Sequence, residues 1–169
     1  MTTPAPTITT RPVTNADAAA ISALHARVFG PGRFVRTAYR VREGTAFATP
    51  YCRVALFGHR IVASLRMTPI TIGGEPGALM LGPLAVDPEF ANLGYGRQLI
   101  AESFEIARTS GQRLVLLVGD MAYYGRLGFQ PVLPPNRITL PGPADPARIL
   151  ALELEQGSLP TYAGLVAPA

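Results

Sequence analysis

The chain has 169 residues, of which 48% are hydrophobic and 15% charged, so the sequence predicts a single globular domain rather than a disordered chain. All fifteen basic residues are arginine. The lack of lysine excludes a Schiff-base lysine, a Walker-type nucleotide loop and a Ser–Lys pair. The formal net charge of +4 is too small and too dispersed to indicate nucleic-acid binding.

The order of elements is predicted from apolar periodicity and turn residues. After a flexible tail over residues 1–7, we expect one domain over residues 8–169. Strands are predicted over residues 8–12, 52–57, 61–72, 78–86, 113–118, 129–132 and 149–154, and helices over residues 14–29, 33–42, 94–109 and 121–127. The strands between residues 52 and 86 form antiparallel hairpins. The strand–helix–strand unit that follows should be parallel, because its second strand is wholly apolar.

The cysteine and histidine content indicates an intracellular protein without disulfides or a metal site. The single cysteine, Cys52, allows no disulfide within the chain, and its apolar neighbours indicate a buried structural thiol. His25 and His59 lack the spacing of metal ligands. The sequence shows no signal peptide and no apolar stretch long enough to cross a bilayer. We therefore expect a cytoplasmic protein with no metal site and no membrane association.

Two glycines, Gly94 and Gly96, stand where the helix over residues 94–109 begins. A helix N-terminus offers unpaired N–H groups and a partial positive charge, which favour a phosphate group. A dinucleotide-binding fingerprint is excluded because Leu99 occupies the place of its third glycine. Two interpretations remain open: a loop from Ala91 that wraps a diphosphate, with Arg97 in the first helical turn, or a tight turn that serves packing alone.

Two further features lie on either side of this helix. Gly82-Pro83 interrupts an apolar strand, and proline fits a central strand only at a bulge, which frees neighbouring N–H groups. Tyr124 lies four residues before Gly128-Phe129 on a short helix that follows a buried strand. On that segment alone, a core tyrosine with its hydroxyl hydrogen-bonded is the simpler interpretation.

Together these segments resemble the GNAT superfamily of N-acetyltransferases. Residues 84–100 are similar to the superfamily's acetyl-CoA motif, a Leu-Ala-Val strand end followed by Pro and then Gln/Arg-x-x-Gly-x-Gly/Ala. Residues 123–129 are similar to its Tyr-x-x-x-Gly-Phe segment. One residue departs from the pattern: Ala91 replaces the usual Gln or Arg. The phrases LGPLAVDP and LVLLVGDMAYYGRLGF look closest to a bacterial branch of acetyltransferases.

The resemblance implies an α/β (α+β) fold with a mixed, mostly antiparallel sheet, a central β-α-β acetyl-CoA unit and three α/β/α layers. It also implies direct attack of a primary amine on the acetyl thioester, with Tyr124 as the general acid and Tyr123 packed inward. Backbone N–H groups of the strand end would stabilise the oxyanion. The residues implied in cofactor binding are Leu84, Ala85, Val86, Ala91, Asn92, Leu93, Gly94, Tyr95, Gly96 and Arg97.

The sequence says less about the general base and the acceptor than about the cofactor site. The strand over residues 113–118 has no carboxylate, so Asp120, just beyond it, is the candidate base, acting through water; the alternative is an ordinary helix N-cap. The acceptor, a small-molecule or protein amine, should enter near the first two helices. Phe34, Arg36 and Tyr39 are candidates for lining that pocket, and Arg33, Arg36 and Arg40 form either a solvated helix face or an anion site.

Two matters stay open from the sequence. One is activity: the alternative to an acetyltransferase is a non-catalytic GNAT-like module that binds an acyl-CoA as a sensor or interaction domain. The other is assembly: a homodimer could form through the last predicted strand and the tail over residues 162–169.

Overall fold

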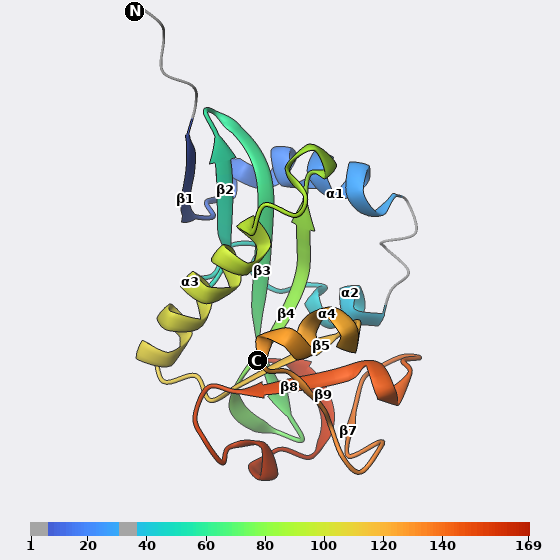
Figure 1. Cartoon of the computed structure of the whole chain (residues 1–169). Helices are drawn as coiled ribbons and strands as arrows, with labels where there is room; N and C mark the ends of the chain where they lie inside the picture. Colours follow the sequence, from blue (N-terminus) through green and yellow to red (C-terminus); the bar gives the residue numbers. More distant parts are fainter. Residues whose placement is uncertain (1–6, 31–36) are drawn as a thin grey trace, which may run out of the picture.

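The structure is a computed structural model that describes residues 7–30 and 37–169 (Figure 1). Its strands are β1 (Ile8–Pro12), β2 (Arg53–Phe57), β3 (Arg60–Ile72), β4 (Glu75–Val86), β5 (Leu114–Val118), β6 (Gln130–Pro131), β7 (Ile138–Thr139), β8 (Ile149–Glu153) and β9 (Gly164–Pro168). Its α-helices are α1 (Ala18–Phe29), α2 (Thr37–Arg42), α3 (Tyr95–Thr109) and α4 (Met121–Tyr124). Short 3-10 turns are η1 (Asn15–Asp17), η3 (Pro88–Phe90), η4 (Gly125–Leu127), η5 (Pro146–Arg148) and η6 (Leu159–Thr161).

The strands join in one mixed sheet. Its main path runs β1-β2-β3-β4-β5-β8-β6, and every neighbouring pair on this path is antiparallel except β4 and β5. The parallel pair is connected through α3, as the sequence predicts for a strand–helix–strand unit. The predicted mixed, mostly antiparallel sheet with a central β-α-β unit is therefore confirmed.

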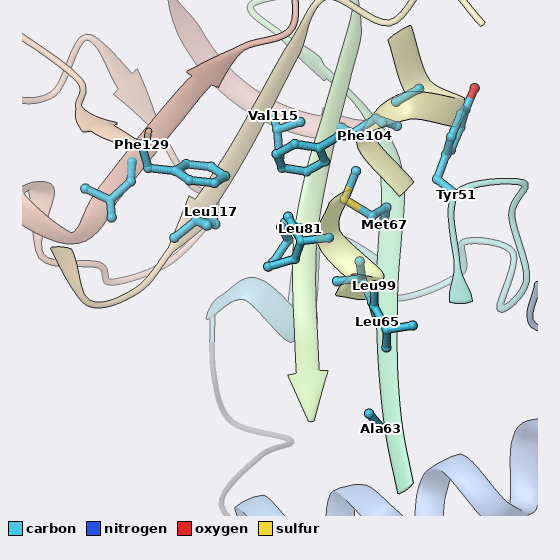
Figure 2. Close-up of a cluster of buried hydrophobic side chains, with 14 of the residues drawn as sticks. Tyr51, Ala63, Leu65, Met67, Leu81, Leu99, Phe104, Val115, Leu117 and Phe129 are labelled. Carbon is cyan, nitrogen blue, oxygen red and sulfur yellow. The ribbon is translucent and has the colours of Figure 1, made fainter. Parts of the chain in front are cut away.

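Helices cover both faces of this sheet. Helix α3 buries Leu99, Ile100, Phe104 and Ala107, the stripe expected of an amphipathic helix, in a cluster with residues of β3, β4 and β5. Figure 2 shows this cluster, in which Phe104 and Val115 lie close together beside Leu81 and Met67. Helix α1 packs Ile21 and Leu24 into a separate cluster that contains Val54 and Ala85. Because neighbouring strand residues point to opposite faces, these two clusters lie on opposite sides of the sheet.

The C-terminal segment forms a strand that the sequence analysis missed. Strand β9 pairs with the far end of β3, where Ile72 lies opposite Val166, and its other edge pairs with β7. Strand β9 thus pairs within the chain with both β3 and β7, and the homodimer considered from the sequence stays a prediction. No α-helix in the described part of the chain is long and apolar enough to span a membrane.

Candidate functional site

The parallel strands β4 and β5 separate part of the way along the sheet. Their pairing ends at Met80 and Leu116, yet β4 continues to Val86. The β3–β4 register shifts at the same place: Leu65 lies opposite Leu84 while Met67 lies opposite Leu81, so β4 contains one extra residue. This is the bulge predicted at Gly82-Pro83. Beyond it, one edge of β4 has no strand partner among the residues that the structure describes.

The backbone orientation at the end of β4 follows from a single hydrogen bond. The Asp87 N–H donates to the Val62 carbonyl of β3 at 2.8 Å. Since amides alternate sides along a strand, Ala85 also faces β3, whereas Leu84 and Val86 face the open edge toward β5. Of the three residues predicted at this strand end, two therefore direct an amide into the split.

The loop that follows presents a run of unpaired amides. We call residues 91–97, from Ala91 to Arg97, the amide loop. None of the six N–H groups of residues 92–97 donates a hydrogen bond to another residue in the described ranges. Asn92 (φ 62°) and Gly94 (φ 87°) adopt left-handed conformations that turn the chain into α3, and Gly94 is the N-cap. Such an arrangement suits a diphosphate.

The two glycines of the amide loop serve different purposes. Gly94 needs its left-handed backbone but has open space where a Cβ would stand. Gly96 is buried in helical backbone, and a Cβ there would lie 3.5 Å from the Tyr123 hydroxyl, 3.5 Å from Cγ2 of Val86 and 3.6 Å from Cδ2 of Leu84. Gly96 therefore keeps a gap between the end of β4 and Tyr123 open.

The remaining side chains of the amide loop are mostly exposed. Ala91, Asn92, Leu93 and Arg97 face solvent, with Leu93 60% exposed, and Tyr95 is half-buried. The expectation that Tyr123 packs inward is wrong. Tyr123 is 39% exposed and its hydroxyl borders the gap at Gly96, because residue 123 lies on the outer side of the single turn α4.

Asp87 fixes the start of this loop. Its buried carboxylate accepts a hydrogen bond from the Glu89 N–H at 3.1 Å and forms ion pairs with Arg60 at 2.7 Å and Arg27 at 3.3 Å. Burial on its own would raise the pKa of Asp87, but the Glu89 hydrogen bond and the two arginines outweigh it, so the pKa is lowered. The charged carboxylate thus ties the end of β4 to β3 and α1.

Tyr124 lies across the split from this strand end. Its ring rests on Gly119, where a Cβ would lie only 2.8 Å from Cε2 of Tyr124, and against Phe129 with ring centroids 5.7 Å apart. The Tyr124 hydroxyl makes no hydrogen bond within the part of the chain that the structure describes, so nothing there supports the interpretation as a hydrogen-bonded core tyrosine. Burial, and to a lesser extent Tyr123, raises the pKa of Tyr124 to about 12.

A cavity of about 810 Å³ opens beside Tyr124. We call it the arginine-lined cavity. Its lining comes from α1, the segment from α2 to β2, the β3–β4 bulge, the end of β5, and the loop before β8: Val13, Ala18, Ile21, Ser22, His25, Phe29, Arg40, Arg42, Phe47, Cys52, Ser64, Leu65, Arg66, Gly82, Pro83, Leu84, Val118, Tyr124, Pro143, Ala144, Asp145 and Arg148. Leu84 both lines this cavity and borders the gap at Gly96, so the cavity and the amide loop meet along the end of β4.

Sequence reasoning missed most of the polar residues of this cavity. His25 of α1 lies with Nε2 3.4 Å from the Ser64 hydroxyl of β3, and Arg42, Arg66 and Arg148 come from three other segments. These residues are far apart in the chain, and no motif connects them. Of the predicted acceptor-side residues, Arg40 lines the cavity. Arg33, Phe34, Arg36 and the side chain of Tyr39 lie outside the described residues.

Asp120 occupies a capping position. Its carboxylate accepts a hydrogen bond from the Ala122 N–H at 2.9 Å as the N-cap of α4. It lines a separate hollow with Gly119, Met121, Ala147 and Arg148 rather than the arginine-lined cavity. The described residues contain no group of three or more His, Cys, Asp or Glu side chains that could hold a metal ion.

Comparison with known proteins agrees with this geometry. A family described as an acetyltransferase (GNAT) domain matches residues 9–132. The uncharacterized N-acetyltransferase YjhQ of Escherichia coli (strain K12) is 30% identical over 118 residues, which cover 68% of this chain and 65% of YjhQ. The matched part thus spans just under two thirds of that relative's length.

Two crystal structures have a similar fold. The GNAT family N-acetyltransferase YhbS from Escherichia coli, in complex with CoA, has a TM-score of 0.81 and 26% identity, and the match covers 100% of this chain and 93% of YhbS. A GNAT family acetyltransferase from Brucella melitensis, in complex with acetyl-CoA, has a TM-score of 0.63 and 25% identity, covering 86% of this chain and 96% of that protein. The family match over residues 9–132 and these similar folds show that this protein belongs to the GNAT superfamily of acetyltransferases.

Proposed function

We propose that the protein transfers the acetyl group of acetyl-CoA to a primary amine by direct attack of the amine on the thioester carbon. Acetyl-CoA, when bound, supplies the activated acetyl group. The protein binds it, orients the amine and moves protons. The crystal structures of YhbS with CoA and of the Brucella melitensis protein with acetyl-CoA support the choice of co-substrate.

One observation carries the proposal: the split between β4 and β5 connects the amide loop to Tyr124 and the cavity. Leu84 borders the gap at Gly96 on one side and the arginine-lined cavity on the other. A molecule with a diphosphate at one end and a reactive thioester at the other can therefore lie along the end of β4. The amine would then approach from the cavity.

The chain offers donors for both charged parts of such a molecule. The amides of residues 92–97 would bind the diphosphate, since they are unpaired among the described residues and lie at the positive end of α3. Because these donors are backbone groups, Ala91 removes a side-chain contact but none of the amides. The Leu84 and Val86 amides at the open edge of β4 would stabilise the oxyanion that develops on the thioester carbonyl oxygen.

Tyr124 would stabilise the departing sulfur through its hydroxyl group. A CoA-like thiol has a pKa of about 8.5. With the pKa of Tyr124 at about 12, complete transfer to the thiolate would cost about 5 kcal/mol. We therefore propose that the hydroxyl acts mainly as a hydrogen-bond donor to the developing charge. Its raised pKa keeps it protonated for this purpose at any physiological pH.

The amine must lose a proton before or during attack, and His25 is the better-placed acceptor for it. His25 lines the same cavity as Tyr124, and an imidazole is a common general base in acyl transfer. Asp120, the base predicted from the sequence, caps α4 and lines a different hollow.

Comparing His25→Gln with Asp120→Asn separates these two candidates. We expect His25→Gln to lower kcat/KM about tenfold or more. Asn is also a good N-cap, so Asp120→Asn should keep α4 in place and leave kcat/KM close to that of the wild type. A comparable loss in Asp120→Asn alone would return the role to Asp120.

The proposed function is tested by two measurements on the purified protein. Isothermal titration with acetyl-CoA should give one binding site per chain, and a thiol reagent should report CoA release only when an amine is added. Binding without release for any amine would support the alternative, a non-catalytic acyl-CoA-binding module. Absence of binding would refute both. We further propose a cytoplasmic location, where the free, buried thiol of Cys52 suits a reducing compartment.

A further inference from the structure

We infer that the acceptor is a small amine that also carries an anionic group, a carboxylate or a phosphate. This inference rests on the proposed function and concerns the same site. The lining of the arginine-lined cavity includes four arginines and a single acidic residue, Asp145. The carboxylate of Asp145 is exposed and accepts the Ala147 N–H at 2.9 Å as the cap of η5. The cavity is therefore strongly cationic.

Three of these arginines are anchored in the wall by the surrounding structure. Arg42 is only 9% exposed, and its Nη1 lies 3.7 Å from where a Cβ on Gly82 would stand, at the bulge. Arg66 donates to the Thr45 hydroxyl at 2.9 Å and lies 5.9 Å from the centre of the Phe47 ring. Arg148 donates from Nε to the Gly119 carbonyl at 3.3 Å.

Arg148 places positive charge next to the proposed reaction centre. Gly119, to which it bonds, is the residue on which the Tyr124 ring rests. Arg40 also lines the cavity, is exposed and forms no ion pair with any residue in the ranges the structure describes. The positively charged lining therefore includes a residue at the bulge, Arg42, and a residue bonded to the glycine beneath Tyr124, Arg148.

Binding of the co-substrate does not account for these charges. None of the residues of the amide loop lines the arginine-lined cavity, so the proposed diphosphate site and the arginines are separate. The parts of the chain outside the described ranges, residues 1–6 and 31–36, contain no Asp or Glu that could neutralise the cavity. An anionic group on the acceptor would bind to these guanidinium groups.

The chemistry of arginine favours this kind of acceptor. Guanidinium groups bind carboxylate or phosphate oxygens through paired hydrogen bonds, and they do so more strongly where water is partly excluded. The same positive field disfavours a second ammonium group and lowers the pKa of the acceptor's own amine. An anionic amine is thus both attracted to the cavity and more easily deprotonated there, whereas a polyamine is repelled.

The test uses pairs of amines that differ only in the anionic group. Leucine is compared with leucinamide, O-phosphoethanolamine with ethanolamine, and putrescine serves as the dication. CoA release is measured for each with the wild-type protein. We expect the anionic member of at least one pair to have a kcat/KM on the order of tenfold or more above its partner. The carboxylate and phosphate pairs distinguish the two sources of negative charge.

Variants assign the preference to the cavity. Arg148→Gln and Arg40→Gln should each reduce the preference for the anionic amine several-fold while leaving the Kd for acetyl-CoA unchanged. Arg108→Gln is the matched control, because Arg108 is exposed on α3 and does not line the cavity. We avoid Arg42 as the main test because it is buried and its replacement could prevent folding.

Failure of this inference is distinguishable from failure of the proposed function. If acetyl transfer occurs but neutral amines or putrescine are used equally well, the acceptor class is refuted and the acetyltransferase stands. If no amine is acetylated, the same pairs are titrated into the CoA-loaded protein. Tighter binding of the anionic members, weakened by Arg148→Gln, still supports the anionic site, and equal binding refutes it.

Discussion

At the scale of single residues, Tyr124 shows how a reactive group depends on its neighbours. The ring is held between Gly119 and Phe129, and Phe129 in turn contacts Phe104 of α3 with ring centroids 6.2 Å apart. The position of the hydroxyl is therefore fixed by the core rather than by a hydrogen bond. That environment also raises the pKa of Tyr124 to about 12, because burial disfavours the tyrosinate.

Replacing Tyr124 with Phe removes the hydroxyl and keeps the ring in place. We expect kcat to fall about a hundredfold while the Kd for acetyl-CoA and the Tm stay the same. Since the hydroxyl of Tyr124 is protonated up to about pH 10, the loss should have the same size between about pH 6 and pH 10. Steady-state kinetics across this range, with calorimetry for acetyl-CoA, provide the measurement. An unchanged kcat would remove Tyr124 from the mechanism.

The two glycines of the amide loop should respond to alanine in opposite ways. Gly94→Ala places a side chain at φ 87° and should destabilise the protein by about 1–2 kcal/mol. Gly96→Ala lies in α3, where alanine is favoured over glycine by about 0.5–1 kcal/mol, so the Tm should hold or rise. Its methyl group would nevertheless fill the gap beside Val86 and Tyr123 and weaken acetyl-CoA binding. Normal acetyl-CoA affinity in Gly96→Ala would show that the diphosphate lies elsewhere.

At the scale of elements, the end of β4 is positioned by charge as well as by hydrogen bonds. Asp87 connects it to Arg60 of β3 and Arg27 of α1. A second Asp-Pro segment, Asp145-Pro146, makes the same N-cap hydrogen bond to the second residue after the aspartate, yet Asp145 forms no ion pair with any other described residue. The two sites therefore separate the effect of the cap from the effect of the ion pairs.

Asp87→Asn and Asp145→Asn test this difference. Both variants keep an oxygen that can accept the N–H bond, and only the first loses ion pairs. We expect Asp87→Asn to lower the Tm by several degrees and Asp145→Asn to change it little. Because the pKa of Asp87 is lowered in the folded protein, its contribution is present above about pH 3.9 and is lost as the pH falls below that value. Equal Tm values for the two variants would show that the ion pairs add no stability.

At the scale of the whole molecule, the long strand β3 organises the sheet. Its first half pairs with β2, its far end pairs with β9, and β4 follows its other edge along most of its length. The C-terminal strand therefore completes the sheet on the side away from the site (Figure 1). The backbones of β9 and the β3–β4 turn approach closely at Gly73 and Gly164.

Substitutions at the adjacent glycines of that turn test how much the packing of β9 against the β3–β4 turn stabilises the protein. Gly73 and Gly74 both have positive φ angles, 58° and 84°, so alanine at either position costs about 1–2 kcal/mol of backbone strain. A Cβ on Gly73 would also overlap the Ala163 carbonyl, whereas a Cβ on Gly74 meets open space. We expect Gly73→Ala to destabilise the protein by about 1–3 kcal/mol more than Gly74→Ala in urea unfolding. Similar values would mean that β9 can move aside freely.

Several features could be predicted because they depend on residues close together in the chain. The bulge at Gly82-Pro83, the helix start at Gly94 and the stripe on α3 are local patterns, and the structure confirms each of them. Strand β9 could not be predicted, because the segment over residues 164–168 is short and contains Gly and Pro. It becomes a strand only through its pairing with β3. The exposure of Tyr123 was mispredicted because a single helical turn gives no periodicity.

The sequence by itself determined the superfamily and the mixed sheet, because glycine, proline and apolar periodicity act over a few neighbouring residues. It also predicted ten cofactor-binding residues in the amide loop and at the strand end before it. Only the tertiary structure decided which polar and charged side chains lie close together. His25, Arg42, Arg66 and Arg148 surround one cavity although 123 positions separate the first from the last. No local sequence pattern predicts that these side chains line one cavity, because their proximity depends on how α1, β3 and the loop before β8 pack around the split between β4 and β5.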